Sequence, residues 1–136
     1  MRILVDTNIC LDILQKRPEF YDSSKNALLY ASEKNHKLYL TSVSIMDIMY
    51  ITRKFFNTAD EQKFVVKNFV SAFRFLKINI KNVNFGFSGL IKDFEDAVQA
   101  SCAKNHLINL IITRNVKDFI NSPVKVITPE EFLKNY

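Results

Sequence analysis

Four aspartates occupy positions where a carboxylate is uncommon, and two of them lie close together. Asp6 ends the short apolar run RILVD, and Asp47 lies among the apolar residues of SVSIMDIMY. Asp93 and Asp96 are three residues apart in DFEDA, a spacing that places both side chains on one face of a helix. Carboxylates brought together repel each other unless a cation or solvent separates them. Their hard oxygen atoms suit Mg²⁺ or Mn²⁺ rather than zinc or copper, and such ions can activate water for attack on a phosphate ester.

Each of these acids also has an ordinary structural role open to it. Asp6 can cap the turn that follows its strand, and Asp93 suits the N-cap position of a helix. Asp47 can be a surface acid, and Asp96 can lie on a solvated helical turn. Three other aspartates fit helix caps or exposed faces better than a site: Asp12, Asp22 and Asp60.

Polar residues also follow two further apolar runs. Ser42 ends KLYLTS, and Thr113, Arg114 and Asn115 end NLIITRN. In a parallel sheet the carboxyl ends of the strands border the ligand crevice. We therefore expect these residues and Asp6 to meet at one edge of a sheet.

The apolar pattern predicts strands and helices in alternation. Short runs rich in Ile, Leu and Val are typical of strands buried in a parallel sheet, and they cover residues 2–6, 37–42, 73–78, 109–113 and 124–128. Helical spacing covers 9–15, 22–33, 43–55, a segment beginning at 58–61, 80–91, 93–104 and a short helix from Pro129. The alternation predicts an α/β fold, with three layers in the order α/β/α around a mainly parallel five-stranded sheet, in a single domain over residues 1–136.

Size and composition limit the classes of protein to consider. The chain has 136 residues, of which 48% are hydrophobic and 24% charged, as in one globular domain. No apolar run approaches the roughly 18–20 residues that cross a bilayer, and the N-terminus lacks a signal-peptide pattern, so we expect a cytoplasmic protein without a membrane partner. Cys10 and Cys102 are expected to be buried, reduced thiols, and two histidines are too few for a standard zinc site. The net charge of +5 is compatible with a nucleic-acid partner without requiring one.

Taken in order, the polar segments resemble the PIN domain family, and more narrowly the VapC-like toxins of bacterial toxin–antitoxin pairs. The segments that carry the resemblance are VDTNICLDIL, LTSVSIMDIMYI, DFEDAVQASCAKNH, LIITRNVKDF and VKVITPEEFL. Together they span nearly the whole chain. The resemblance implies a PIN-like fold and a metal-dependent ribonuclease in which three or four acids hold Mg²⁺ or Mn²⁺.

The resemblance also implies roles for individual acids. Asp6, Asp47 and Asp96 correspond to the catalytic, metal-binding acids, and Asp93 is an additional acid beside them. Asp47 departs from the family, which usually has Glu there, so its side chain is shorter by one methylene. Asn115 falls where a fourth Asp is often found, and its neutral amide weakens a second metal position.

Other residues are implied to support the site or the substrate. Asn8 corresponds to a polar position that helps to order the metal site, and Thr7 and Ser42 correspond to positions that border it. Thr113 is expected near the substrate phosphate.

Cationic side chains have two roles open to them. Arg114 can contact the substrate phosphate, or it can pair with Asp96 or Asp118, and Asp118 is not expected to bind the metal directly. Four other cations can attract an RNA backbone, although each can equally be a solvated surface charge: Arg53, Lys54, Lys92 and Lys117.

The leading hypothesis is hydrolysis of RNA phosphodiester bonds by a toxin whose partners are a small antitoxin protein and a second copy of the chain. The Phe- and Met-rich helices at 43–56 and 64–75 can supply an apolar interface, although the same pattern suits core packing. The alternative is a degenerate, non-catalytic PIN domain that binds protein or RNA, which Asp47 and Asn115 favour. A phosphatase-like enzyme is disfavoured, because the chain lacks a Gly-rich phosphate loop and a nucleophilic Cys motif.

Overall fold

The centre of the molecule is a five-stranded sheet in which every adjacent pair of strands runs parallel. The computed structural model describes residues 1–136. The strands lie in the order β3-β2-β1-β4-β5, and their bounds are β1 Arg2–Val5, β2 Lys37–Thr41, β3 Arg74–Leu76, β4 Leu110–Ile112 and β5 Lys125–Ile127. Each strand lies within a segment predicted from the sequence, so the predicted sheet is confirmed.

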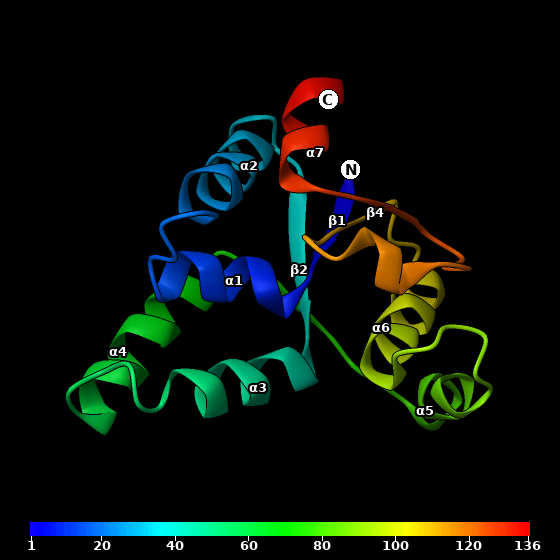
Figure 1. Cartoon of the computed structure of the whole chain (residues 1–136), viewed down its shortest axis with the longest axis horizontal. Helices are drawn as coiled ribbons and strands as arrows, with labels where there is room; N and C mark the ends of the chain where they lie inside the picture. Colours follow the sequence, from blue (N-terminus) through cyan, green and yellow to red (C-terminus); the bar gives the residue numbers. More distant parts are fainter.

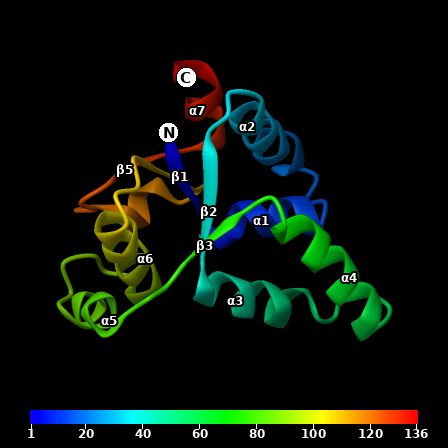
Figure 2. The same ribbon diagram turned by 180° about the vertical axis from the view of Figure 1, so that it is seen from behind.

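Helices cover both faces of this sheet, which confirms the predicted three-layer α/β/α arrangement. Figures 1 and 2 show α1 to α4 on one side and α5 and α6 on the other, with α7 beside α2 near the C-terminus. Their bounds are α1 Thr7–Leu14, α2 Tyr21–Glu33, α3 Ser42–Thr52, α4 Ala59–Val70, α5 Ile80–Phe87, α6 Phe94–Asn105 and α7 Pro129–Asn135, and a 3₁₀ helix spans Val116–Phe119. None of the helices combines the length and the apolar character that crossing a bilayer needs.

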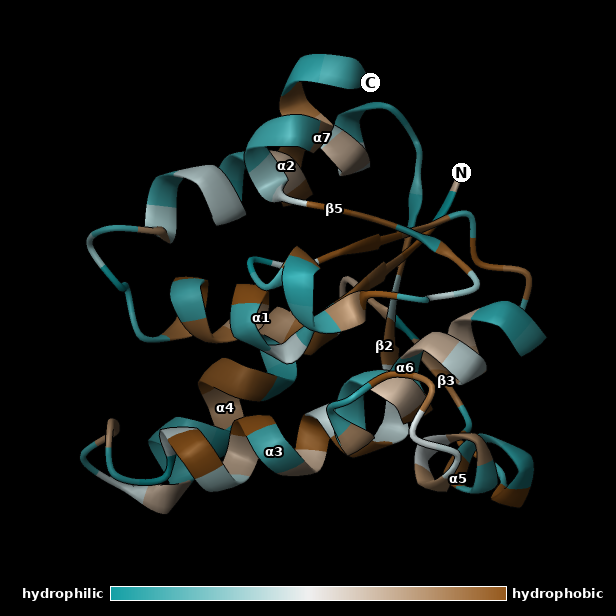
Figure 3. Cartoon of the chain, turned by 45° about the vertical axis from the view of Figure 1, so that its right-hand side comes forward, coloured by the Kyte–Doolittle hydropathy of each residue, from teal (hydrophilic) through white to brown (hydrophobic).

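The central strands carry apolar side chains on both faces. Ile3 and Val5 of β1 pack in a core with α1, α2 and α7, whereas Leu4 between them packs on the opposite face with α6. Successive side chains of a strand point to opposite faces, so a strand covered on both sides must be apolar throughout. Figure 3 accordingly shows strands among the most hydrophobic segments of the molecule, while hydrophilic and hydrophobic residues alternate along the helices.

The strand order places a crevice beside β1. From β1 the sheet continues through β2 to β3 on one side, and through β4 to β5 on the other. Ligands of open parallel sheets bind at such a switch point, outside the carboxyl ends of the strands. Asp6 directly follows β1 and Thr113 directly follows β4, so the fold brings both residues to this crevice.

Several helix boundaries differ from the prediction, since α1 begins at Thr7 rather than at residue 9 and α3 ends at Thr52 rather than at residue 55. Helix α2 begins at Tyr21 with Phe20 at its N-cap, so Asp22 lies in the first turn instead of capping the helix. Helix α5 ends at Phe87 rather than continuing to residue 91, and Gly89 follows with a φ of +75°, a left-handed conformation that glycine adopts readily.

The interior holds one charged residue that the sequence does not reveal as buried. Asp12 is 0% exposed, and its carboxylate lies 2.8 Å from Nε of Arg114 and 3.6 Å from an NH of Arg17. It also accepts a hydrogen bond from the hydroxyl of Ser24. The expectation of an exposed or capping Asp12 is therefore wrong, because two arginines compensate the burial of its charge. Cys10 and Cys102 are buried free thiols, as predicted.

Candidate active site

Six carboxylates line one cavity of about 460 Å³ at the carboxyl edge of the sheet. They come from separate elements, namely Asp6 after β1, Asp47 on α3, Asp93, Glu95 and Asp96 at the start of α6, and Asp118 in the 3₁₀ helix. We call this space the acidic cavity. No Lys or Arg lines it, and both ion pairs of the chain belong to Asp12, so no ion pair neutralises any of the six acids.

Asp6 is fixed by polar side chains from three other parts of the fold. It is 6% exposed, and its Oδ2 accepts hydrogen bonds from Nδ2 of Asn8 and Oγ1 of Thr113, both at 2.7 Å. Its Oδ1 accepts from Nε2 of Gln99 at 3.2 Å. Burial raises the pKa of Asp6, whereas the hydrogen bonds from Thr113 and Gln99 lower it. Asp6 stands at the N-cap position of α1 without a capping hydrogen bond from its side chain, so the capping alternative does not hold.

The start of α6 presents a second group of acids. Asp93 caps the helix, because its Oδ1 accepts a hydrogen bond from the backbone N–H of Asp96 at 3.0 Å. Glu95 and Asp96 lie in the first turn, where the helix dipole favours negative charge. Burial, followed by the negative charges of Asp6 and Asp93, nevertheless raises the pKa of Asp96 to about 7.

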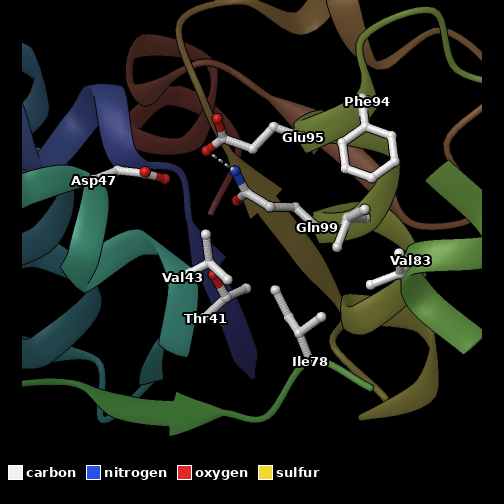
Figure 4. A pocket seen from close by; sticks show the side chains of 9 residues that line it. Thr41, Val43, Asp47, Ile78, Val83, Phe94, Glu95 and Gln99 are labelled. Atoms are coloured by element: carbon white, nitrogen blue, oxygen red, sulfur yellow. Dashed lines mark hydrogen bonds between the residues drawn. The ribbon is translucent and has the colours of Figure 1, made fainter. Parts of the chain in front are cut away.

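Asp47 and Glu95 bring α3 and α6 together across the cavity. In Figure 4 the two carboxyl groups point toward one another, and Oε1 of Glu95 accepts a hydrogen bond of 3.4 Å from Nε2 of Gln99. Burial, then the charge of Asp47 and a hydrogen bond between the two carboxyl groups, raises the pKa of Glu95 to about 7. The buried Oδ2 of Asp47 has no donor when both groups are ionised. Glu95 therefore adds a longer carboxylate beside the short Asp47.

Three of the six predicted supporting residues line the cavity, and Thr113 has a different role. Thr7, Asn8 and Asn115 line the cavity, as expected. Thr113 is fully buried, so it cannot contact a substrate phosphate. Its hydroxyl donates to Asp6 and accepts from Nδ2 of Asn8 at 3.0 Å, which makes it a residue that positions Asp6.

Two further predictions are corrected by the structure. Ser42 is the first residue of α3, where it is exposed and does not line the cavity. The N-cap of this helix is Thr41, whose hydroxyl accepts a hydrogen bond from the backbone N–H of Ser44. Arg114 is held by Asp12, and its guanidinium stacks over the ring of Phe20 at 4.1 Å. It therefore pairs with neither Asp96 nor Asp118.

Two residues at the site were missed from the sequence. Glu95 and Gln99 are four residues apart on α6, so they lie on one helical face. Gln99 is the one amide in a stretch of small and apolar residues, AVQASCA, and that isolation in a buried helix face is the signal that marks it. For Glu95 the signal is weaker, because an acid in the first turn of a helix is ordinary.

The donors suit a hard divalent cation. Aspartate and glutamate oxygens line the cavity without a counter-charge, and burial, followed by repulsion among the acids, raises the pKa values of Glu95 and Asp96 to about 7. A bound Mg²⁺ or Mn²⁺ would relieve that repulsion. The acids line the cavity wall, and no three His, Cys, Asp or Glu side chains are grouped at the spacing of metal ligands.

The sequence and the fold define the class of protein. The family model described as PIN domain matches residues 2–117, so the chain belongs to the PIN domain family. A comparison with curated proteins finds no match.

Solved structures share the fold over nearly their whole length. A chain of VapBC2 from Rickettsia felis, bound to a DNA fragment from their promoter, has a TM-score of 0.70 and 22% identity, covering 94% of this chain and 98% of that chain. A toxin–antitoxin complex from Klebsiella pneumoniae has a TM-score of 0.70 and 24% identity, covering 93% of this chain and 97% of that chain. FitAcB from Neisseria gonorrhoeae has a TM-score of 0.71 and 18% identity, covering 94% of this chain and 98% of that chain. At these identities the likeness establishes the fold, which confirms the resemblance to VapC-like PIN domains at that level.

Proposed function

We propose that the chain is a metal-dependent ribonuclease and the toxin of a toxin–antitoxin pair. The observation that carries this proposal is the acidic cavity, where six uncompensated carboxylates meet at the switch point of a PIN fold. Such a cavity repels a bare phosphodiester, so it suits nucleic-acid chemistry only when a divalent cation lies between the acids and the phosphate.

In the proposed site Asp6, Asp47 and Asp96 hold Mg²⁺ or Mn²⁺, with Asp93 beside them. The bound ion supplies Lewis-acid activation of water and charge stabilisation of the leaving oxygen. Hydrolysis adds the oxygen of water to phosphorus and breaks the bond from phosphorus to the adjoining nucleotide. Asn8 and Thr113 hold the carboxylate of Asp6 in a fixed orientation for this task.

Two lysines provide a path for the RNA backbone. Lys92 and Lys117 line a cavity of about 510 Å³ that shares Asp93 and Asp118 with the acidic cavity. Positive side chains next to the acids can bind the phosphates that flank the scissile one. Arg53 is less available, because its guanidinium stacks over Tyr50 at 3.8 Å and donates to the carbonyl of that residue.

Protein partners are part of the same proposal. Similar solved structures include VapBC2 and a toxin–antitoxin complex, and on that basis we propose an antitoxin as a partner of this chain. The surface of α3 is suited to a protein partner, because Met46 and Tyr50 are exposed while Ile48 packs in the core. Either an antitoxin or a second copy of the chain can cover this face.

The alternative is a PIN domain that binds RNA or protein without cleaving it. The short Asp47 and the neutral Asn115 favour this alternative, because both reduce the ligand set relative to the family pattern. A titration with Mn²⁺ separates the two proposals: a competent site binds the ion with an affinity that Asp96→Asn lowers, and a non-catalytic domain does not.

The deciding experiment compares RNA cleavage by wild type, Asp96→Asn and Asp60→Asn. Asp60 is an exposed acid in the first turn of α4, so it provides a matched change of charge away from the cavity. We expect Mn²⁺-stimulated cleavage to be retained in Asp60→Asn and to fall to the uncatalysed background in Asp96→Asn and Asp6→Asn. Circular dichroism must show that all variants are folded. Equal cleavage by wild type and Asp96→Asn would contradict the proposal and point to a contaminating nuclease.

A further inference from the structure

A second cavity adjoins the acidic cavity and has a different character. It has a volume of about 300 Å³, at the lower end of the range of about 300 to 1,000 Å³ for small-molecule pockets. Asp47 and Glu95 line both cavities and so form the wall between them. The rest of the second cavity is mostly apolar, as Figure 4 shows, and is lined by Thr41, Val43, Ile78, Val83, Phe94, Val98 and Gln99.

One buried side chain in this second cavity lacks a hydrogen-bond partner. Gln99 is 2% exposed, and its Oε1 accepts no hydrogen bond. The amide cannot flip to correct this, because its Nε2 already donates to the carboxylates of Asp6 and Glu95. An oxygen in place of that nitrogen would face two carboxylates and repel them. A buried carbonyl without a donor costs free energy, so the cavity is incomplete until a donor enters it.

One other acceptor of the cavity lacks a donor when the acids are ionised. It is the buried Oδ2 of Asp47, whereas the carboxylate of Glu95 accepts from Gln99. Thr41 is already satisfied, because its hydroxyl pairs with Ser44. The ligand must therefore present hydrogen-bond donors along one edge and apolar faces to Phe94 and the valines.

We infer that this second cavity, bounded by Asp47, Gln99, Val83 and Phe94, binds a base of the RNA substrate and prefers guanine. The inference rests on the proposed ribonuclease function and names a specificity element for it. A strand whose scissile phosphate lies in the acidic cavity carries a base within one nucleotide of the shared wall. Bases of single-stranded RNA are free to leave the stack and enter a side pocket, which we call the base pocket.

The hydrogen-bonding pattern selects among the four bases. Guanine presents two neighbouring donors, N1–H and N2–H₂, equal in number to the two acceptors that lack a donor, Oε1 of Gln99 and Oδ2 of Asp47. Adenine and cytosine each present one amino group. Uracil presents a single N–H between two carbonyl oxygens, and these would face the acidic wall. The expected order is guanine first, adenine and cytosine next, and uracil last.

The test maps cleavage sites in a random-sequence RNA with Mn²⁺ present. Two variants change the base pocket: Val83→Phe fills it, and Phe94→Leu keeps it open but removes the ring. Phe55→Leu is the matched control, because Phe55 is 49% exposed, close to the 45% of Phe94, and does not line the pocket. We expect wild type and the control to enrich guanine over uracil by about tenfold at one fixed position relative to the cut. We expect both pocket variants to lose most of that enrichment while still cleaving RNA.

Other outcomes of this test overturn the inference. Cleavage without a preferred base, a preference for uracil, or a preference that survives both pocket variants would each do so. A change of oligomeric state in Val83→Phe without a change of base preference would show instead that a second copy of the chain covers the pocket.

If wild type does not cleave RNA, the proposed function is wrong. A second measurement then still tests the base pocket. Titration with guanosine and uridine, followed by NMR without metal, uses neutral ligands that the acids do not repel. Tighter binding of guanosine, lost in Val83→Phe, supports the base pocket independently of catalysis. Equal binding of the two nucleosides, or none, overturns it.

Discussion

At the scale of single residues, the hydroxyl of Thr113 has a testable effect on the metal site. It donates to Asp6 and accepts from Asn8, so it holds the carboxylate and the amide together. In Thr113→Val the charged form of Asp6 loses a hydrogen bond, and its pKa, already raised by burial, rises further. We expect the affinity for Mn²⁺ at pH 7 to fall about 10-fold to 100-fold, as for other residues that orient a ligand. Isothermal titration calorimetry measures this loss.

The control for this variant is Thr58→Val. Thr58 caps α4, so its loss costs stability without touching the acidic cavity. Wild-type Mn²⁺ affinity in Thr58→Val together with reduced affinity in Thr113→Val would assign the effect to Asp6. An unchanged affinity in Thr113→Val would mean that Asp6 needs no such support.

The same scale shows what can be predicted from individual residues. The sequence allowed us to predict that three acids lie at one edge of the sheet, namely Asp6, Asp47 and Asp96. The prediction was possible because residues that follow parallel strands share an edge, and because helices with capping signals begin at that edge. Glu95 could not be placed, because its direction toward Asp47 depends on how α6 packs relative to α3. The pairing of Arg114 with Asp12 joins positions 102 residues apart and has no local signal.

At the scale of elements, the buried ion pair of Asp12 ties α1 to the loop after β4. Removing one partner of such a pair leaves an uncompensated charge in the interior. We expect Asp12→Ala to lower the free energy of unfolding by about 3 kcal/mol. Denaturation by urea measures the loss, and Asp22→Ala, an exposed acid in the first turn of α2, should stay within about 0.5 kcal/mol of wild type. Similar free energies of unfolding in the two variants would show that the ion pair between Asp12 and the arginines does not stabilise the fold.

Element type was predictable where the pattern was strong, and element ends were less so. The central strands β1 and β4 were found because parallel strands buried on both faces are continuous apolar runs, whereas the edge strands β3 and β5 are partly exposed and were found from shorter apolar runs. The end of α5 was placed too late, because Leu90 and Ile91 are apolar, although Ile91 packs in the core as a loop residue. The start of α2 was misplaced, because tertiary packing rather than a polar side chain determines where it begins.

At the scale of the whole molecule, a chain of net charge +5 gathers six of its 14 acids in one cavity, and this has a consequence for stability. The pKa values of Asp96 and Glu95 rise from 3.8 and 4.5 in the unfolded chain to about 7 in the folded protein. The folded protein therefore binds more protons than the unfolded chain between pH 4 and pH 7. Stability is fully present below the unfolded pKa values and is lost as pH rises through 7.

The comparison of wild type with Asp96→Asn isolates this effect. His36 acts in the opposite direction, because burial and then the positive N-terminus lower its pKa, but it is common to both proteins. Without metal, we expect the melting temperature of wild type to fall from pH 5 to pH 8 by a few degrees more than that of Asp96→Asn. This corresponds to about 1 kcal/mol, after allowing for solvent screening of a half-exposed group. Added Mn²⁺ should raise the melting temperature of wild type at pH 8 and have little effect on the variant. Parallel pH profiles for the two proteins, with no response to Mn²⁺ in either, would show that the acids of the cavity do not repel one another enough to bind a cation.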